Sequence, residues 1–432
     1  MNRDGGDAKQ VRMWPYYPEL LETPVPRYTS FPTAAEFTPA VGADDLDAAL
    51  RGVSGEVSLY VHIPWCERKC PYCDFNSHEG FQTDYQGAYV DALLLDLQSQ
   101  LQWVGHRRLA SIFIGGGTPS LFSGPFIGRL LDGIACQIAL APEAEITLES
   151  NPGSAERDRY RDYFNAGVNR LSIGVQSFDD RALHALGRIH SGADARRAID
   201  LAASAGFSRW NLDLMHGLPG QSTDQAIADI SEAIALSNGH LSWYQLTIER
   251  NTRFWSDTPE LPDEDTLEDI QRAGEGLLAE AGLMQYEVSA YARTGQASQH
   301  NLNYWSFGDY LGIGAGAHGK VTTDEGAILR TQRTRSPTDY LTQMASAPVA
   351  APKGAPVSEQ QLVGEFVMNA LRLREGCRLE LFSERTGRPL ADLTAAATRA
   401  VEAGWLEPLE PGSLRTTALG YRHLDTVVAA FL

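Results

Sequence analysis

The sequence predicts an α/β protein with a parallel sheet and a smaller second domain. Strand-like runs alternate with helical runs from residue 57 to about residue 291, a pattern typical of strands joined by crossover helices. A Pro- and Ala-rich segment at 346–358 is typical of a linker and precedes the C-terminal region 359–432. The 432 residues are enough for one large domain and one small domain.

Composition excludes several classes of protein. A hydrophobic share of 43% and a charged share of 21% are typical of a soluble globular protein. The formal net charge of −19 argues against a broad nucleic-acid surface, so we expect no nucleic-acid partner. Five cysteines are too few for a disulfide scaffold. We find no apolar run of 18 residues and no signal-peptide core, and we therefore expect a cytoplasmic protein without a membrane span.

The chain starts with a segment rich in Pro, Gly and Asp. We expect residues 1–52 to form an N-terminal arm with a short helix at about 44–50, followed by a large domain at 53–345. Between the first two strands, the apolar residues Tyr89, Leu93, Leu97 and Leu101 repeat every four residues, as on the buried face of a helix. Six strands are predicted in the large domain, at 57–63, 109–114, 145–150, 170–175, 208–215 and 241–248.

Three cysteines follow the first strand. Cys66, Cys70 and Cys73 have the spacing C-x3-C-x2-C, and Pro64 ends the strand, so the cysteines lie on a loop at its C-terminal end. A cubane iron–sulfur cluster is normally held by four thiolates, and three leave one iron open to another ligand. On spacing alone, a zinc site with His78 as fourth ligand, a disulfide with a spare thiol, or three structural cysteines remain alternatives.

The longer run YVHIPWC…CPYCDF, with Tyr72 before the last cysteine, resembles the signature of radical S-adenosylmethionine (SAM) proteins. It is most similar to the branch that holds the oxygen-independent coproporphyrinogen III oxidases (HemN) and the HemW heme chaperones. This resemblance implies a partial (β/α)6 TIM-type barrel, a [4Fe-4S] cluster on the three cysteines and SAM on the open iron. In such barrels the chemistry takes place at the C-terminal ends of the strands.

Polar residues stand near the ends of the predicted strands. Tyr60 and His62 lie on the face of the first strand opposite its apolar residues, and would therefore point into a barrel. Taken singly, such residues are more often core, turn or capping residues. The resemblance implies that His62 lies near the sulfonium of SAM as the candidate catalytic residue. It implies cofactor contacts from Tyr60, Tyr72, Gly116, Gly117, Thr118, Glu149, Gln176, Arg188 and Asp213.

A stretch beyond the barrel strands bears on the substrate. A histidine beside aromatic residues is either an axial iron ligand with stacking walls or part of an ordinary buried aromatic cluster. The pattern H-N-x-x-Y-W, formed by His300, Asn301, Tyr304 and Trp305, resembles the heme-binding motif of HemW proteins. Oxidases usually carry an additional cysteine at the position of Phe75.

The core of the chain therefore favours a heme chaperone that passes heme to an unidentified acceptor protein and receives electrons from an unidentified donor. The segment 26–37 in the N-terminal arm is instead similar to the oxidases. The alternative function is thus an oxygen-independent coproporphyrinogen III oxidase, which decarboxylates porphyrinogen propionates to vinyl groups. The C-terminal region resembles a small winged-helix-like HemN-type domain, for which few basic residues favour a lid or docking role.

Overall fold

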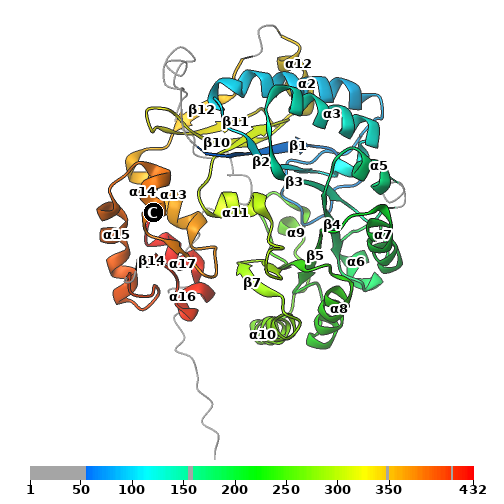
Figure 1. The fold of residues 1–432 in the computed structure, drawn as a ribbon. Helices are drawn as coiled ribbons and strands as arrows, with labels where there is room; N and C mark the ends of the chain where they lie inside the picture. The colour runs from blue at the N-terminus through cyan, green and yellow to red at the C-terminus, as the bar shows by residue number, and fades with distance from the viewer. Residues whose placement is uncertain (1–54, 154–158, 347–349, 410–411) are drawn as a thin grey trace, which may run out of the picture.

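One large curved sheet organises the molecule. The structure, a computed structural model, describes residues 55–153, 159–346, 350–409 and 412–432 (Figure 1). The expected N-terminal arm, its helix and the oxidase-like segment lie outside these residues. Within them, twelve strands pair in the order β12-β11-β10-β9-β1-β2-β3-β4-β5-β6-β8-β7. The order does not close on itself, so the sheet is an open arc, and α11 (Gln299–Trp305) lies inside its curve (Figure 1).

The six central strands are parallel and run in chain order, which confirms the predicted α/β class. Each of them overlaps one of the six predicted strands. Their apolar runs are buried on the sheet, as expected for strands that are covered by helices. They are β1 (Val57–Ile63), β2 (Leu109–Gly116), β3 (Leu140–Ser150), β4 (Arg170–Gln176), β5 (Trp210–His216) and β6 (His240–Gln245).

Further strands extend both edges of this core. On one side β9 (Tyr310–Ile313) pairs parallel with β1, followed by the antiparallel strands β10 (His318–Thr322), β11 (Ile328–Gln332) and β12 (Lys353–Pro356). The predicted linker 346–358 therefore contains a sheet strand, which the Pro and Ala content concealed. On the other side β8 (Ala290–Ala292) and β7 (Met284–Glu287) continue the sheet antiparallel.

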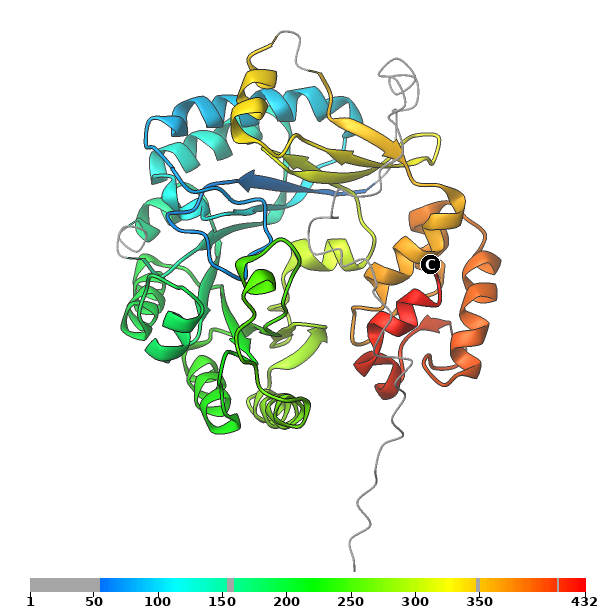
Figure 2. The ribbon, with the colours of Figure 1, turned by 180° about the vertical axis from the view of Figure 1, so that it is seen from behind.

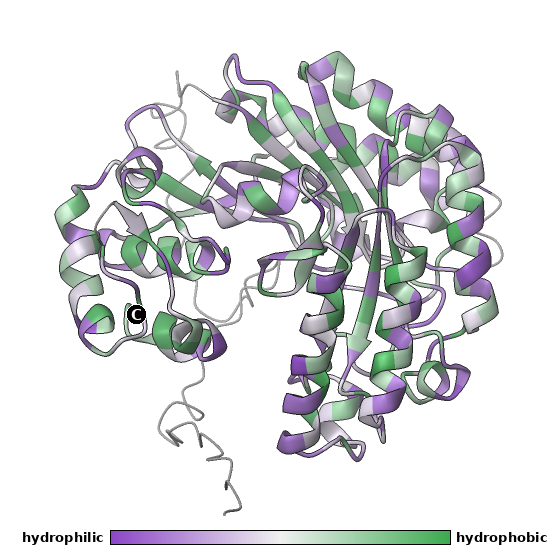
Figure 3. Cartoon of the chain, turned by 60° about the horizontal axis from the view of Figure 1, so that its bottom comes forward, coloured by the Kyte–Doolittle hydropathy of each residue, from purple (hydrophilic) through white to green (hydrophobic). Residues whose placement is uncertain are grey.

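Helices cover the outer face of the arc. In α2 the predicted stripe is confirmed for Tyr89, Leu93 and Leu97, which are fully buried. Leu101, its fourth member, lies just beyond the helix in a 3-10 turn and is half-buried. Two helices begin with capping boxes, at Ser191 for α7 and at Ser222 for α8, which satisfy backbone donors that the first turn leaves open. Figure 3 shows hydrophobic runs along the central strands and mixed outer helices. The covering helices are α2 (Tyr85–Gln100), α3 (Gly124–Gln137), α5 (Tyr160–Asn165), α6 (Asp180–Ala185), α7 (Gly192–Ala205), α8 (Thr223–Leu236), α10 (Glu264–Glu280) and α12 (Pro337–Met344).

A smaller domain follows the sheet and has its own apolar core. Phe366 and Phe382 lie at its centre, and Phe307 and Ile328 of the large domain join the same cluster. The domain therefore packs against the large one beside α11 (Figure 2). Its elements are α13 (Glu359–Ala370), β13 (Cys377–Arg378), α14 (Glu380–Thr386), α15 (Leu390–Glu402), β14 (Ser413–Leu414), α16 (Ala418–Arg422) and α17 (Leu424–Ala429). In the described parts of the chain, every helix is too short or too polar to cross a bilayer.

Candidate functional site

The three cysteines lie on a loop beyond the C-terminal end of β1, as predicted. Two backbone hydrogen bonds close the base of the loop, from Cys66 N to His78 O at 2.9 Å and from His78 N to Pro64 O at 2.7 Å. Cys66 is buried, whereas Cys70 and Cys73 are half-buried, and all three thiols are free. The loop thus presents three free thiols from one short segment.

The glycine-rich motif GGGTP at residues 115–119, which begins at the end of β2, holds this loop in place. Gly117 N donates to Ile63 O at 2.8 Å, and Thr118 N donates to Trp65 O at 2.7 Å. A Cβ atom on Gly117 would lie 2.5 Å from Trp65 O, closer than atoms can approach. The family resemblance implies cofactor contacts from Gly116 and Gly117. For Gly117, the close neighbour is the cysteine loop itself.

Arg188 connects the cysteine loop to the strand ends. Its guanidinium donates to Cys70 Sγ at 3.5 Å, to Asn151 Oδ1 at 2.6 Å and to Gly174 O at 2.9 Å. Asn151 in turn donates from Nδ2 to Thr118 Oγ1 at 2.9 Å. Sequence reasoning missed Asn151, although it stands two residues after Glu149 in the run ESNP. Asn151 therefore links Arg188 and Thr118, two of the predicted SAM contacts.

The donor set of the loop suits an iron–sulfur cluster. The Arg188 cation at Cys70 complements the negative charge that thiolates bring to a cluster. Burial raises the pKa of Cys73 to about 11, so metal binding would have to displace its proton. Among the described residues, no group of three His, Cys, Asp or Glu side chains is arranged around one metal-ion position. His78, the alternative zinc ligand, instead donates from Nε2 to Asn76 Oδ1 at 3.3 Å.

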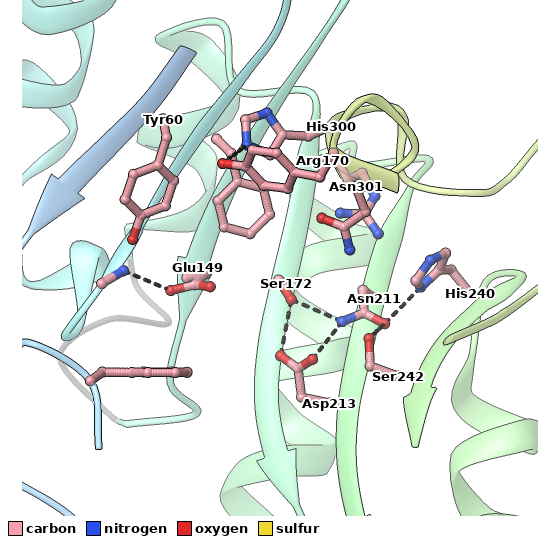
Figure 4. Close-up of a pocket in the computed structure, with 14 residues that line it drawn as sticks. Tyr60, Glu149, Arg170, Ser172, Asn211, Asp213, His240, Ser242, His300 and Asn301 are labelled. Atoms are coloured by element: carbon pink, nitrogen blue, oxygen red, sulfur yellow. Dashed lines mark hydrogen bonds between the residues drawn. The ribbon is translucent and has the colours of Figure 1, made fainter. Parts of the chain in front are cut away.

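A cavity opens inside the curve of the sheet (Figure 4). Its empty space, counted out to its open mouth, is about 680 Å³. Four predicted SAM contacts line it, namely Tyr60, Gly116, Glu149 and Asp213. Three residues of the H-N-x-x-Y-W pattern line it as well, namely His300, Asn301 and Tyr304. The fold therefore brings both predicted sets to one cavity.

Other predicted residues surround the cavity without lining it, including Gly117, Thr118 and Arg188 at the cysteine loop. Tyr72 packs against Phe254, with ring centroids 6.3 Å apart, in a small apolar cluster. Trp305 lies against Arg372 of the C-terminal domain, whose guanidinium carbon is 4.2 Å from the ring centroid. For these residues the predicted cofactor contacts stay predictions.

His62 is fully buried and bridges two segments. Tyr60 donates from its hydroxyl to His62 Nδ1 at 2.9 Å, and His62 Nε2 donates to Asn76 O at 2.9 Å. Burial lowers the pKa of His62 to about 4, so the imidazole is neutral at pH 7. His62 does not line the cavity. In this arrangement it positions Tyr60, and its predicted catalytic role stays a prediction.

Two carboxyl groups give one part of the cavity its acidic character. Burial, and then the neighbouring charge of Asp213, raise the pKa of Glu149 to about 8, although Gly116 N donates to its Oε2 at 3.0 Å. Burial also raises the pKa of Asp213. Asp213 accepts hydrogen bonds from Ser172 Oγ at 2.9 Å and from Asn211 Nδ2 at 2.8 Å (Figure 4). These groups can accept hydrogen bonds from a ribose or face a ligand ammonium group.

Gln176 ends β4 in a conformation that is uncommon for a residue with a side chain. Its φ of 69° is positive, and holding a non-glycine residue there costs on the order of 1–3 kcal/mol. The side chain accepts a hydrogen bond at Oε1 from Tyr244 OH at 2.9 Å. Such local strain often accompanies functional sites. It agrees with the predicted role of Gln176 but does not test it.

His300 is 1% exposed, and both of its ring nitrogens have partners. Ser111 Oγ donates to Ser58 Oγ at 2.8 Å, so His300 Nδ1 donates to Ser111 Oγ at 2.9 Å. His300 Nε2 then accepts from Tyr304 OH at 2.8 Å, an assignment that follows from the hydrogen-bond network. Phe113 stacks on the imidazole, with ring centroids 5.1 Å apart. The Nε2 lone pair that an iron would need is therefore held by Tyr304.

The H-N-x-x-Y-W residues lie at the N-terminal half of the strands. Ser111, the partner of His300, is the third residue of β2, whereas the glycine motif begins near the end of that strand. At about 3.3 Å per residue, the five positions from Ser111 to Gly116 span roughly 16 Å. The rule that chemistry takes place at C-terminal strand ends thus fits the cysteine loop but not this motif.

Comparisons with known proteins agree with this geometry. The radical SAM superfamily profile matches residues 60–233, and the HemN C-terminal domain profile matches residues 357–423. A protein of Escherichia coli described as "Heme chaperone HemW" is 52% identical over 331 residues, which are 77% of this chain and 86% of that protein. A mouse protein described as "Radical S-adenosyl methionine domain-containing protein 1, mitochondrial" is 36% identical over 357 residues, 81% of this chain and 80% of that protein.

Among solved structures, the fold is similar to that of the coproporphyrinogen III oxidase HemN from Escherichia coli. The TM-score is 0.78, and the match covers 94% of this chain and 96% of that chain. Because the sequence identity is 22%, this likeness supports the fold alone. The radical SAM barrel and a C-terminal domain of HemN type are therefore confirmed.

Proposed function

This chain belongs to the HemW family of radical SAM proteins, and from that premise we propose that it binds heme and passes it to an acceptor protein. Membership of the radical SAM superfamily implies a [4Fe-4S] cluster and SAM. A bound cluster would supply the electron needed to cleave SAM. We propose Cys66, Cys70 and Cys73 as the cluster ligands. The free thiols suit a reducing compartment, for which we propose the cytoplasm.

The observation that carries the proposal is the shared cavity. Three residues of the H-N-x-x-Y-W pattern line the same space as Tyr60, Gly116, Glu149 and Asp213. Bound SAM and bound heme would therefore meet in one site. In the acidic part, we propose that Glu149 and Asp213 face the ribose and ammonium groups of SAM, while Tyr60 is fixed by His62.

At the other end, we propose His300 as the axial iron ligand. Ser111 fixes its Nδ1–H and so directs Nε2 toward the cavity residue Tyr304. This is the arrangement in which an outer partner orients a metal-binding histidine. Iron binding requires the Tyr304 hydroxyl to move away from Nε2, because one lone pair cannot serve both. Tyr304 is thus proposed as the residue that controls access to the ligand.

The test is heme titration of anaerobically reconstituted protein, followed by the Soret absorbance. We expect His300→Ala to weaken heme binding at least about 10-fold, because the ligand is lost. Tyr304→Phe is expected to keep or increase affinity, because it releases the Nε2 lone pair. His216→Ala is the matched control. His216 is also a buried histidine with a pKa lowered to about 4, but its ring packs at a tilt against Trp243 and does not line the cavity.

Two results of the heme titration would count against the proposal. If His300→Ala keeps wild-type affinity, His300 is not the ligand. If Tyr304→Phe loses heme as strongly as His300→Ala, the hydroxyl contributes directly to binding and does not compete for the lone pair. The competing activity is tested by anaerobic incubation with coproporphyrinogen III, SAM and a reductant. Multiple-turnover formation of protoporphyrinogen would favour the oxidase function over the chaperone function.

A further inference from the structure

One part of the cavity has no ligand assigned to it. Arg170, the first residue of β4, lines the cavity at the N-terminal end of the strands, together with His240, the first residue of β6. His300 and Asn301 of α11 line the same end. We call these four residues the cavity floor. None of the expected SAM contacts belongs to it.

The floor carries a buried positive charge that its neighbours compensate only in part. Arg170 is 2% exposed, and its guanidinium makes one long hydrogen bond, to Thr147 Oγ1 at 3.4 Å. Its nearest carboxylate is Glu145 Oε2, 3.9 Å from Nε. Glu145 also forms a closer ion pair, at 2.9 Å, with Arg209 Nη2. Two arginines thus share one carboxylate, so one cationic charge remains beside the cavity.

The other titratable groups at the floor do not supply the missing negative charge. His240 Nδ1 donates to Asn211 Oδ1 at 2.7 Å, and His240 Nε2 accepts from Tyr286 OH at 2.9 Å, so the imidazole is neutral. Asp213 is the next carboxyl group along the cavity; the charge of Arg170 acts to lower its pKa, but its hydrogen bonds come from Ser172 and Asn211. It makes no ion pair with Arg170 among the described residues. A buried cation without a close partner is costly, so an anionic ligand would stabilise it.

Asn301 adds a donor that points into the same space. Its backbone N–H donates a hydrogen bond to Ser298 Oγ at 3.3 Å, but within the described parts of the chain its side-chain carboxamide makes no hydrogen bond. In Figure 4 the side chains of Asn301 and Arg170 overlap in the view shown. A guanidinium fork and a carboxamide N–H together match the acceptor pattern of a carboxylate.

The position of the floor identifies the source of that carboxylate. Arg170 and Gln176 are the first and last residues of β4, so their Cα atoms lie roughly 20 Å apart at about 3.3 Å per residue. If SAM binds with its amino-acid end at the cysteine loop, its own carboxylate lies near the far end of this strand. Arg170 instead lies close enough to His300 for its charge to contribute to lowering the pKa of that histidine.

We propose that Arg170 and Asn301 bind a propionate carboxylate of the tetrapyrrole, with Arg170 as the charged anchor. This inference rests on the proposed heme function and assigns the orientation of the ligand in the same site. The propionate would complete the charge balance of the Arg170–Glu145–Arg209 group. Arg170 and Asn301 would then set the direction in which heme enters, and favour a free acid over an ester.

The experiment compares iron protoporphyrin IX with its dimethyl ester on the reconstituted full chain. We expect the wild type to bind the diacid about 10- to 100-fold more tightly than the diester, the typical range for a hydrogen bond to a charged group. In Arg170→Gln this preference should disappear through loss of diacid affinity, with diester affinity unchanged. Arg170→Lys should restore part of the preference. Arg209→Gln is the matched control, because Arg209 pairs with the same Glu145 but does not line the cavity.

The outcomes show whether the carboxylate at the cavity floor belongs to heme or to SAM. Equal binding of diacid and diester by the wild type overturns the inference and needs no variant, while heme binding itself, and with it the proposed function, would stand. If Arg170→Gln weakens SAM binding and leaves the diacid preference intact, the carboxylate belongs to SAM and the inference is wrong. If the wild type binds neither porphyrin, the proposed function fails as well. Arg209→Gln losing the preference as fully as Arg170→Gln would indicate a general effect of the ion-pair group and overturn the assignment.

Discussion

Replacing Gly117 with alanine tests whether the glycine motif holds the cysteine loop. The added Cβ would lie 2.5 Å from Trp65 O and 2.7 Å from Trp65 C, both backbone atoms of the loop. A rotamer change cannot relieve a clash with backbone, so the loop or the motif must move. Any such movement lengthens the hydrogen bonds from Gly117 N to Ile63 O and from Thr118 N to Trp65 O.

The size of the effect follows from these contacts. Overpacking by one methyl group typically costs about 1–3 kcal/mol. Two backbone hydrogen bonds contribute about 0.5–1.5 kcal/mol each, so the local cost for Gly117→Ala is roughly 2–6 kcal/mol. The loop can relieve part of this by detaching from the motif while the strands stay paired. We therefore expect cluster assembly to suffer more than global stability.

The assay is iron and sulfide content after anaerobic reconstitution, with urea unfolding in parallel. We expect Gly117→Ala to hold less than about half of the wild-type iron. The control is Gly276→Ala, at an exposed helical position where an added Cβ meets no atom within 4 Å. That variant should keep its iron and gain about 0.5–1 kcal/mol of stability from helix propensity. Wild-type iron content in Gly117→Ala would refute the reasoning.

Two further predictions concern buried charges. The pKa of Glu149 is raised to about 8 in the folded metal-free protein, against roughly 4.3 when unfolded, so its stabilising contribution falls as pH rises through this window. The buried histidines contribute equally to both proteins, so the wild type should lose unfolding free energy relative to Glu149→Gln between pH 6.5 and 8; a constant difference would contradict this. Arg372 donates to Glu287 at 3.0 Å and covers Trp305, so Arg372→Met should cost about 1–3 kcal/mol in urea unfolding. A loss below 0.5 kcal/mol would mean that this contact does not hold the C-terminal domain to α11.

Much of the fold could be predicted from local pattern. Apolar alternation in β1 and the four-residue repeat of Tyr89, Leu93 and Leu97 depend only on which face is buried, and both predictions hold. The segment 346–358 shows the limit of such patterns. Its Pro and Ala content is typical of a linker, yet residues 353–356 pair with β11, because an edge strand needs backbone hydrogen bonds more than a distinctive side-chain pattern.

The candidate site also contains residues that the sequence could predict and residues that it could not. The positions of Cys66, Cys70 and Cys73 on one loop follow from a short sequence interval, and the structure places them there. The same spacing could not reveal Asn151, which acts only because Arg188 and Thr118 reach it from other loops. Nor could it reveal that Gly117 faces the cysteine loop instead of a ligand, since that contact joins the end of β1 to the end of β2.

By itself, the sequence determined the order of strands and helices, the cysteine loop and the family motifs, because each depends on residues that are close along the chain. Only the tertiary structure decided what meets in the cavity. Arg170 and His300 are 130 positions apart, yet the curved sheet brings both to its floor and leaves Glu145 shared between two arginines. Charge balance and lone-pair occupancy depend on distances between such residues, and those distances exist only after the sheet has curved around α11.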